Sequence, residues 1–198
     1  MPVPQSIKKT AEQDLAHPLD DFYGRAGLPL PPMAEVDALE LPEPYRSLLA
    51  HEHDMTSTLE KFHGSRIHLR LQSKRQQVAN YFREVVLELD GSNKPVEFGA
   101  INIHLDLFPQ EARDRILQEY FPLGRILNES GMVYFSRPVA YLRFASDLLI
   151  NELLGLHGAQ ILFGRRNQLL DAQERSLAEI IEILPPAETK RGARKEGA

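Results

Sequence analysis

The sequence YFREVVLELDGSNKPVEFGAINIHLDL, residues 81–107, predicts two strands joined by a tight turn. Successive side chains of a strand point to opposite faces, so Val85 and Leu87 share one apolar face with Arg83. The segment DGSNKP, residues 90–95, has the composition of a hairpin turn, and a second strand follows it. A guanidinium stays charged at any ordinary pH. The first strand therefore places a cation on an apolar face, where it needs a partner.

Carboxylates on neighbouring strands are one possible partner for Arg83. In the second strand, Glu97 lies on the same face as the apolar residues, so its side chain is expected to point inward. In the final predicted strand, residues 176–185, Glu179 and Glu182 fall on opposite faces, and both faces are apolar, so parity does not choose between them. A buried ion pair contributes little to stability because both groups must be desolvated. A ligand carboxylate is the other possible partner, since it matches the guanidinium fork. Both explanations stay open.

Two further motifs contain residue types that bind ligands. In GRR, residues 164–166, the two arginines fall on opposite faces of a strand, so that one lies at the surface and the other can meet an anionic ligand. HEHD, residues 51–54, contains metal-ligand residue types, but ligands on a helix pair at i and i+3 or i+4. His51 and His53 are two residues apart, so we interpret them as solvated helix-end residues and predict no metal site.

The rest of the chain alternates between predicted strands and helices. We predict two short helices within residues 42–64, joined near His53, and further helices within 109–127 and 146–156; strands are predicted at 66–72, 137–145 and 158–171. Neighbouring strands with helices beside them predict an α+β fold, with a mostly antiparallel sheet flanked by helices. Residues 1–34 are proline-rich and predict an extended N-terminal arm, 35–188 a single domain, and 189–198 a charged flexible tail.

Composition limits the class of protein. The chain has 198 residues, of which 42% are hydrophobic and 26% charged, as is ordinary for one soluble globular domain. It has no cysteine, which excludes disulfides, thiolate metal sites and a cysteine nucleophile. The formal net charge of −5 offers no overall positive field for nucleic acid or anionic lipid, and no apolar run approaches the ~20 residues of a membrane span. We expect a cytoplasmic domain with neither partner.

Five segments, taken in order, resemble the chorismate pyruvate-lyase family. They lie within about residues 46–186 and are LLAHEHDMTSTLEKFHG (48–64), YFREVVLELDGSNKPVEFGAINI (81–103), FPLGRIL (121–127), FGRRNQL (163–169) and AEIIEILP (178–185). The order and spacing of all five segments, rather than any one of them, carry the resemblance.

The resemblance implies that a ligand is enclosed under helical flaps on an antiparallel sheet. It also implies conversion of chorismate to 4-hydroxybenzoate and pyruvate, without metal or organic cofactor. By motif match, Arg83 resembles the arginine that clamps the ring carboxylate, and Glu182 the glutamate near the hydroxyl and enolpyruvyl end. Met55 and Leu123 match flap positions whose main chain helps to enclose the substrate. The better-known enzymes carry an arginine shortly after the turn, where this sequence has Ala100.

A binding module is the alternative. The effector domains of one large group of bacterial transcription regulators share this fold and a similar arginine and hairpin pattern, and a fold does not determine a function. Such regulators carry an N-terminal helix-turn-helix domain, for which residues 1–34 are too short. Under this alternative, we expect a free-standing sensor or carrier of aromatic carboxylates.

Overall fold

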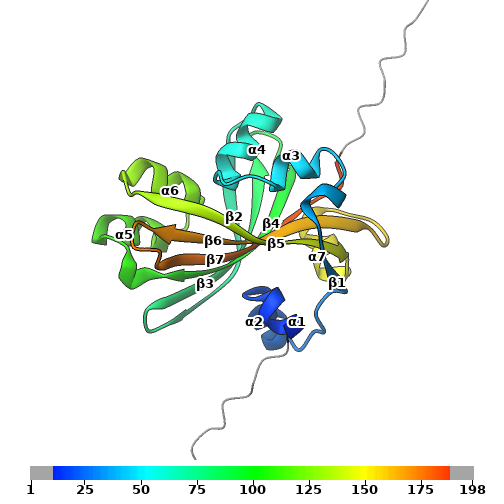
Figure 1. Ribbon diagram of the computed structural model, residues 1–198, viewed down its shortest axis with the longest axis horizontal. Coiled ribbons are helices and arrows are strands. Elements are labelled where there is room, and N and C mark those ends of the chain that lie inside the picture. The colour runs from blue at the N-terminus through cyan, green and yellow to red at the C-terminus, as the bar shows by residue number, and fades with distance from the viewer. Residues whose placement is uncertain (1–10, 188–198) are drawn as a thin grey trace, which may run out of the picture.

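One seven-stranded sheet forms the centre of the protein. The computed structural model describes residues 11–187, with side chains from residue 14 onward. The strands are β1 (Met33–Val36), β2 (Ile67–Gln77), β3 (Asn80–Leu89), β4 (Pro95–His104), β5 (Tyr134–Ala145), β6 (Ile161–Asp171) and β7 (Ser176–Leu184). Their order across the sheet is β1-β5-β6-β7-β4-β3-β2, and each neighbouring pair is antiparallel (Figure 1). This is the antiparallel sheet that the sequence predicts.

Helices cover both faces of the sheet. The first face packs against α3 (Tyr45–Leu49), α4 (Met55–His63), α5 (Gln110–Gln118) and α6 (Leu123–Ser130), and the second against α2 (Leu19–Ala26) and α7 (Leu148–Leu154). The short segments α1 (Ala11–Ala16), η1 (Ala38–Glu40) and η2 (Leu105–Leu107) complete the described helices. In Figure 1, α3 and α4 lie above the sheet, whereas α1 and α2 lie below it. Two hydrophobic cores result, one on each face, so β7 is apolar on both of its faces.

The hairpin of residues 81–107 forms as predicted. β3 and β4 pair with Arg83 opposite Ile101 and Val85 opposite Gly99. Between them, Gly91 takes a positive φ of 81°, a conformation that glycine adopts without strain. Val85 packs in the first core, so Arg83, which has the same parity, faces the first side of the sheet.

The N-terminal segment differs from the extended arm predicted for residues 1–34. Residues 11–16 and 19–26 are helical, and β1 adds a strand to the edge of the sheet beside β5. Burial explains the difference, because Leu19, Phe22 and Tyr23 of α2 insert into the second core. The prediction was wrong for the described part of this segment. Residues 1–10 and the predicted tail at 189–198 lie outside the described residues.

The helical pattern predicted within residues 109–127 is divided between α5 and α6. α5 ends where Glu119 adopts a left-handed conformation with φ 63°, and α6 begins after Pro122. A proline within a helix removes a main-chain donor and clashes with the preceding turn, so a continuous helix cannot pass this point. Tyr120, which the pattern assigned to the helix, lies in the break and is exposed.

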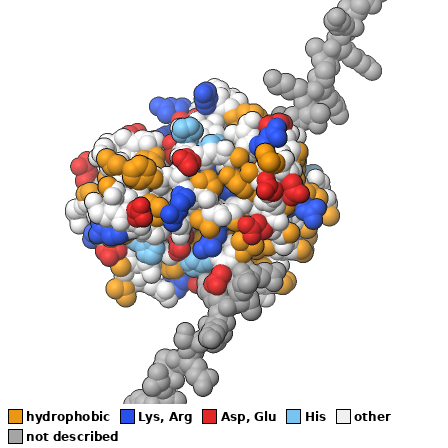
Figure 2. Space-filling model, in the orientation of Figure 1, with side chains coloured by type: hydrophobic (Ala, Val, Ile, Leu, Met, Phe, Trp, Pro, Cys, Tyr) orange, Lys and Arg blue, Asp and Glu red, His pale blue; other side chains and the backbone are white. Residues whose placement is uncertain are grey.

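The surface carries charges of both signs. Figure 2 shows Lys and Arg side chains interspersed with Asp and Glu over the face that it draws, with apolar side chains scattered between them. A mixed surface on this face presents no extended field of one sign to a polyanion. The described helices are short, with at most nine residues, and none of them is long and apolar enough to cross a membrane.

Candidate functional site

A cavity lies on the first face of the sheet, beneath the beginnings of α4 and α6. Strands β2, β3, β4, β6 and β7 form its floor and walls, and the space between them measures about 450 Å³, its opening included. Counted only where the centre of a water molecule fits, the volume is about 40 Å³. The lining residues are Asp54, Met55, Thr56, Leu69, Arg83, Val85, Leu87, Glu97, Ile101, Pro122, Leu123, Gly124, Leu169, Ile180 and Glu182. The four residues predicted from the family resemblance, Arg83, Glu182, Met55 and Leu123, therefore surround one space.

Arg83 is a buried cation without a matching anion beside it. Its side chain is 0% exposed, and none of its three guanidinium nitrogens has a hydrogen-bond partner among the described residues. Burial lowers the pKa of Arg83 to about 10, although Tyr81 and Glu119 act in the opposite direction. Glu119 accepts hydrogen bonds from the Tyr81 hydroxyl at 2.6 Å and from Lys74 Nζ at 2.7 Å. The ion pair with a sheet glutamate, one of the two explanations open from the sequence, is not formed.

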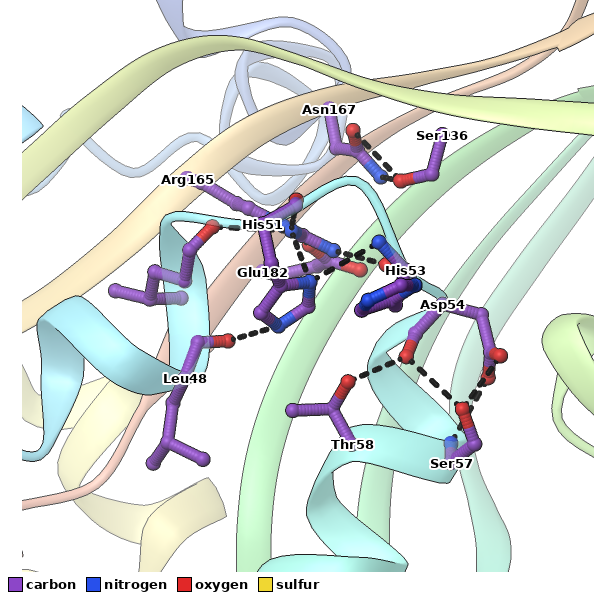
Figure 3. Close-up of polar contacts among 11 residues, drawn as sticks. Leu48, His51, His53, Asp54, Ser57, Thr58, Ser136, Arg165, Asn167 and Glu182 are labelled. Atoms are coloured by element: carbon purple, nitrogen blue, oxygen red, sulfur yellow. Dashed lines mark hydrogen bonds and ion pairs between the residues drawn. The ribbon is translucent and has the colours of Figure 1, made fainter.

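Glu182 is paired with a different arginine. Arg165 of β6 lies opposite Glu182 of β7, and its Nε donates a hydrogen bond to the Glu182 carboxylate. The same guanidinium donates to the main-chain oxygens of Leu49 at 3.0 Å, His51 at 2.9 Å and His53 at 3.4 Å. Figure 3 shows Arg165 reaching from the strands to this loop between α3 and α4. The buried ion pair thus fixes the loop that leads into the roof of the cavity.

Glu97 is a second carboxyl group in the cavity. It is 4% exposed, and its Oε2 has no hydrogen-bond partner among the described residues. Burial raises the pKa of Glu97 well above its usual range, and the nearby charge of Glu182 raises it further, whereas Arg165 lowers it. The net effect favours the protonated, neutral form of Glu97. The inward direction predicted for this residue agrees with its position.

Met55 and Leu123 form part of the roof. Met55 is the first residue of α4 and Leu123 the first of α6, and both are buried. Asp54 caps α4 and also accepts a hydrogen bond from Asn128 of α6 at 3.3 Å. A Cβ atom on Gly124 would lie only 2.8 Å from Asp54 Oδ1. The two helices therefore meet over the cavity through a close contact at Gly124, where an added Cβ would displace the Asp54 carboxylate.

The opposite face of the sheet carries Glu179. Its carboxylate lies 3.5 Å from His17 Nε2 and 3.9 Å from an Arg166 nitrogen. The hydrogen bond with His17 is the largest effect that lowers the pKa of Glu179 to about 2. Ala100 also packs on this face, in the second core, so a side chain at position 100 points away from the cavity. Ile101 is the neighbouring residue that lines the cavity, and no arginine stands there.

The HEHD segment forms the loop that Arg165 holds. The His51 and His53 rings are stacked with centroids 5.6 Å apart, and their main-chain oxygens accept from Arg165. His53 is exposed, but His51 is half-buried, and this burial lowers its pKa. The interpretation as solvated residues therefore holds for His53 and is wrong for His51. Within the described residues, no group of three His, Cys, Asp or Glu side chains is arranged to hold a metal ion.

Comparisons with known proteins show the fold. No family model matches the sequence, and no curated protein matches it. Among solved structures, the effector domain of PhnF from Mycobacterium smegmatis has a TM-score of 0.51 at 14% identity, covering 67% of this chain and 88% of that chain. A GntR-family transcriptional regulator from Bacillus cereus has a TM-score of 0.43 at 10% identity, covering 62% and 96%. The α+β fold predicted from the sequence is confirmed, whereas membership of the chorismate lyase family stays a prediction.

Proposed function

We propose that the protein binds a small cyclic or aromatic carboxylate in the cavity, with the carboxylate at Arg83. One observation carries this proposal: a fully buried guanidinium has three nitrogens without hydrogen-bond partners among the described residues. Buried donors that stay unpaired are unfavourable, and a bidentate carboxylate satisfies two of them at once. The apolar walls contributed by Val85, Leu87 and Ile101 suit the ring of such a ligand.

Strand register gives the relative positions of Arg83 and Glu182. Arg83 lies opposite Ile101, which lies opposite Ile180, whereas Glu182 lies opposite Gly99. Glu182 is thus two residues, or about 7 Å, further along the strands than Arg83, and about 10 Å away across the sheet because β4 lies between β3 and β7. Both side chains are long and line one cavity, so a single ring with a carboxylate at one end and an oxygen substituent at the other can lie between their polar groups.

Within this ligand class we propose chorismate as the substrate and its cleavage as the reaction. A specific observation favours catalysis over binding alone: Glu182, which the resemblance matches to the family's glutamate, lines the same cavity as Arg83. Besides its ion pair with Arg165, this carboxylate is a group that can take part in proton movement next to the ring. The alternative, a carrier or sensor domain, is favoured by the fold shared with the PhnF effector domain.

The proposed reaction needs few groups from the protein. The C–H bond on the hydroxyl-bearing ring carbon breaks, and its electron pair completes the aromatic ring as the C–O bond to the enolpyruvyl group breaks. The released enolpyruvate then gains a proton at carbon and becomes pyruvate, which balances the atoms of chorismate. Arg83 holds and orients the ring, and Glu182 assists the proton movement in a site shielded from water. Arg165 fixes the position of Glu182 through their buried ion pair.

Purified protein mixed with chorismate tests both functions, with pyruvate and 4-hydroxybenzoate measured together. A lyase releases both products, and Glu182→Gln lowers the turnover roughly 10²–10⁴-fold while ligand binding persists. Glu179→Gln is the matched control, since Glu179 lies on the other face of the same strand. Binding of 4-hydroxybenzoate without any pyruvate release would identify a binding module. Absence of both binding and turnover would contradict the proposal entirely.

A further inference from the structure

The Glu97 carboxyl group lies over a glycine at the centre of the site. Gly99 follows Glu97 on the same face of β4 and lies opposite Val85 on one side and Glu182 on the other. Glu97 Oε1 is only 3.2 Å from the position that a Cβ of Gly99 would occupy. The side chain of Glu97 therefore bends along the strand, over Gly99, towards the level of Glu182. Because Gly99 has no side chain, space remains there for a carboxyl group.

The carboxylate nearest in effect to Glu97 is already paired with an arginine. Glu182 is engaged by Arg165, and Glu97 Oε2 has no hydrogen-bond partner within the described residues. A neutral carboxyl group carries one O–H donor. Burial and the charge of Glu182 raise the pKa of Glu97 well above its usual range, which favours the form that carries this donor. Arg83 and Glu97 thus present donors at the two ends of the same apolar cavity.

We infer that Glu97 is a specificity-determining residue: its carboxyl group donates a hydrogen bond to a ligand oxygen on the ring side opposite the carboxylate. This role deepens the proposed function and rests on it, because it assumes that the ligand carboxylate binds at Arg83. The ligand class is then narrower than carboxylates in general. It consists of ring carboxylates with a hydroxyl or ether oxygen on the ring side opposite the carboxylate.

Calorimetry with two ligands, 4-hydroxybenzoate and benzoate, tests the inference. The parent protein is expected to bind 4-hydroxybenzoate about 2- to 10-fold more tightly than benzoate, the usual contribution of one hydrogen bond. Glu97→Gln keeps a donor of the same shape and keeps this preference. Glu97→Met removes the donor and brings the ratio close to one, while its affinity for benzoate changes by less than about twofold. Glu179→Gln, on the opposite face, serves as the control and leaves both affinities unchanged.

Each result has a definite meaning. If the parent binds both ligands equally, or if Glu97→Met keeps the preference, the role of Glu97 is refuted although the Arg83 site stands. If the parent binds neither ligand, the proposed function fails, and the role of Glu97 fails with it. Infrared difference spectra of the parent against Glu97→Gln test the donor without any ligand. The carbonyl band of a protonated carboxyl group is expected at neutral pH, and its absence would overturn the inference.

Discussion

Arg83→Met is expected to stabilise the protein and to abolish tight ligand binding. Burial lowers the pKa of Arg83 from its ordinary value to about 10, which corresponds to about 3 kcal/mol of unfavourable free energy for the charged form in the fold. Methionine keeps part of the length and removes the charge, although it packs less completely. We therefore expect the free energy of unfolding of the ligand-free variant to rise by roughly 1–3 kcal/mol at pH 7. The affinity for 4-hydroxybenzoate should fall by about 2–5 kcal/mol, because the ligand carboxylate loses its partner.

Arg165→Met is the matched control for this prediction. Both arginines are 0% exposed and lie in strands of the same sheet, but Arg165 has a carboxylate partner in Glu182. Removal of one member of a buried ion pair leaves the other charge uncompensated, at a loss of about 3–5 kcal/mol. The same substitution should thus change stability in opposite directions at the two positions. A loop held by three main-chain hydrogen bonds from Arg165 is also released.

Urea unfolding at pH 7 and calorimetric titration measure the two quantities on the same samples. The reasoning is refuted if Arg83→Met loses several kcal/mol of stability and keeps its affinity, since Arg83 would then be a structural group with a protein partner. A second check uses Arg83→Lys, which keeps the charge without the planar fork. This variant should recover only part of the affinity lost in Arg83→Met.

Two further perturbations test the other parts of the site. The unfolded chain ionises Glu97 at the ordinary glutamate pKa, whereas the fold retains its proton, so rising pH should lower the stability of the parent relative to Glu97→Gln. The difference in the free energy of unfolding between Glu97→Gln and the parent should grow by about 1.4 kcal/mol per pH unit above about pH 4.3, until the pKa of Glu97 in the folded protein is passed. If urea unfolding gives the same difference at every pH from 4 to 8, the prediction is wrong. Gly124→Ala should displace the carboxylate of Asp54 and lower stability by about 1 kcal/mol, as the loss of a helix cap does. Gly24→Ala, where nothing lies within 4 Å of the added atom, is the control and should not lower the melting temperature; an equal loss in both variants would refute the contact.

The strands could be predicted from the sequence because their side chains alternate on a regular period. The hairpin of residues 81–107 and the strands at 158–171 and 176–185 were found in this way. The helix α2 was missed, since its buried side chains contact the second face of the sheet, and this contact is absent from any local pattern. A proline-rich composition suggested an extended arm where tertiary contacts stabilise a helix.

Those parts of the candidate site that follow from the side-chain pattern of one strand could be predicted from the sequence. Parity identified Arg83, because one charged residue interrupts an apolar face. Parity could not separate Glu179 from Glu182, since helices cover both faces of β7 and make both apolar. The pairing of Arg165 with Glu182 was missed, yet a count back from the strand ends at residues 171 and 176 places these two residues opposite each other.

The net charge of the cavity is the feature that agrees least with the lyase proposal. Arg83 supplies one positive charge, Glu182 and Arg165 compensate each other, and the neutral form of Glu97 adds none. Among the buried charges, one ligand carboxylate therefore balances Arg83, which suits 4-hydroxybenzoate; the partly buried Asp54 adds a further negative charge in the roof. Chorismate carries a second carboxylate, and Asp54 in the roof would repel it. If the protein is a lyase, this group must lie towards the opening of the cavity, so the affinity for chorismate should depend more on salt than that for 4-hydroxybenzoate. Equal salt dependence would place both carboxylates inside and contradict this account of the charges.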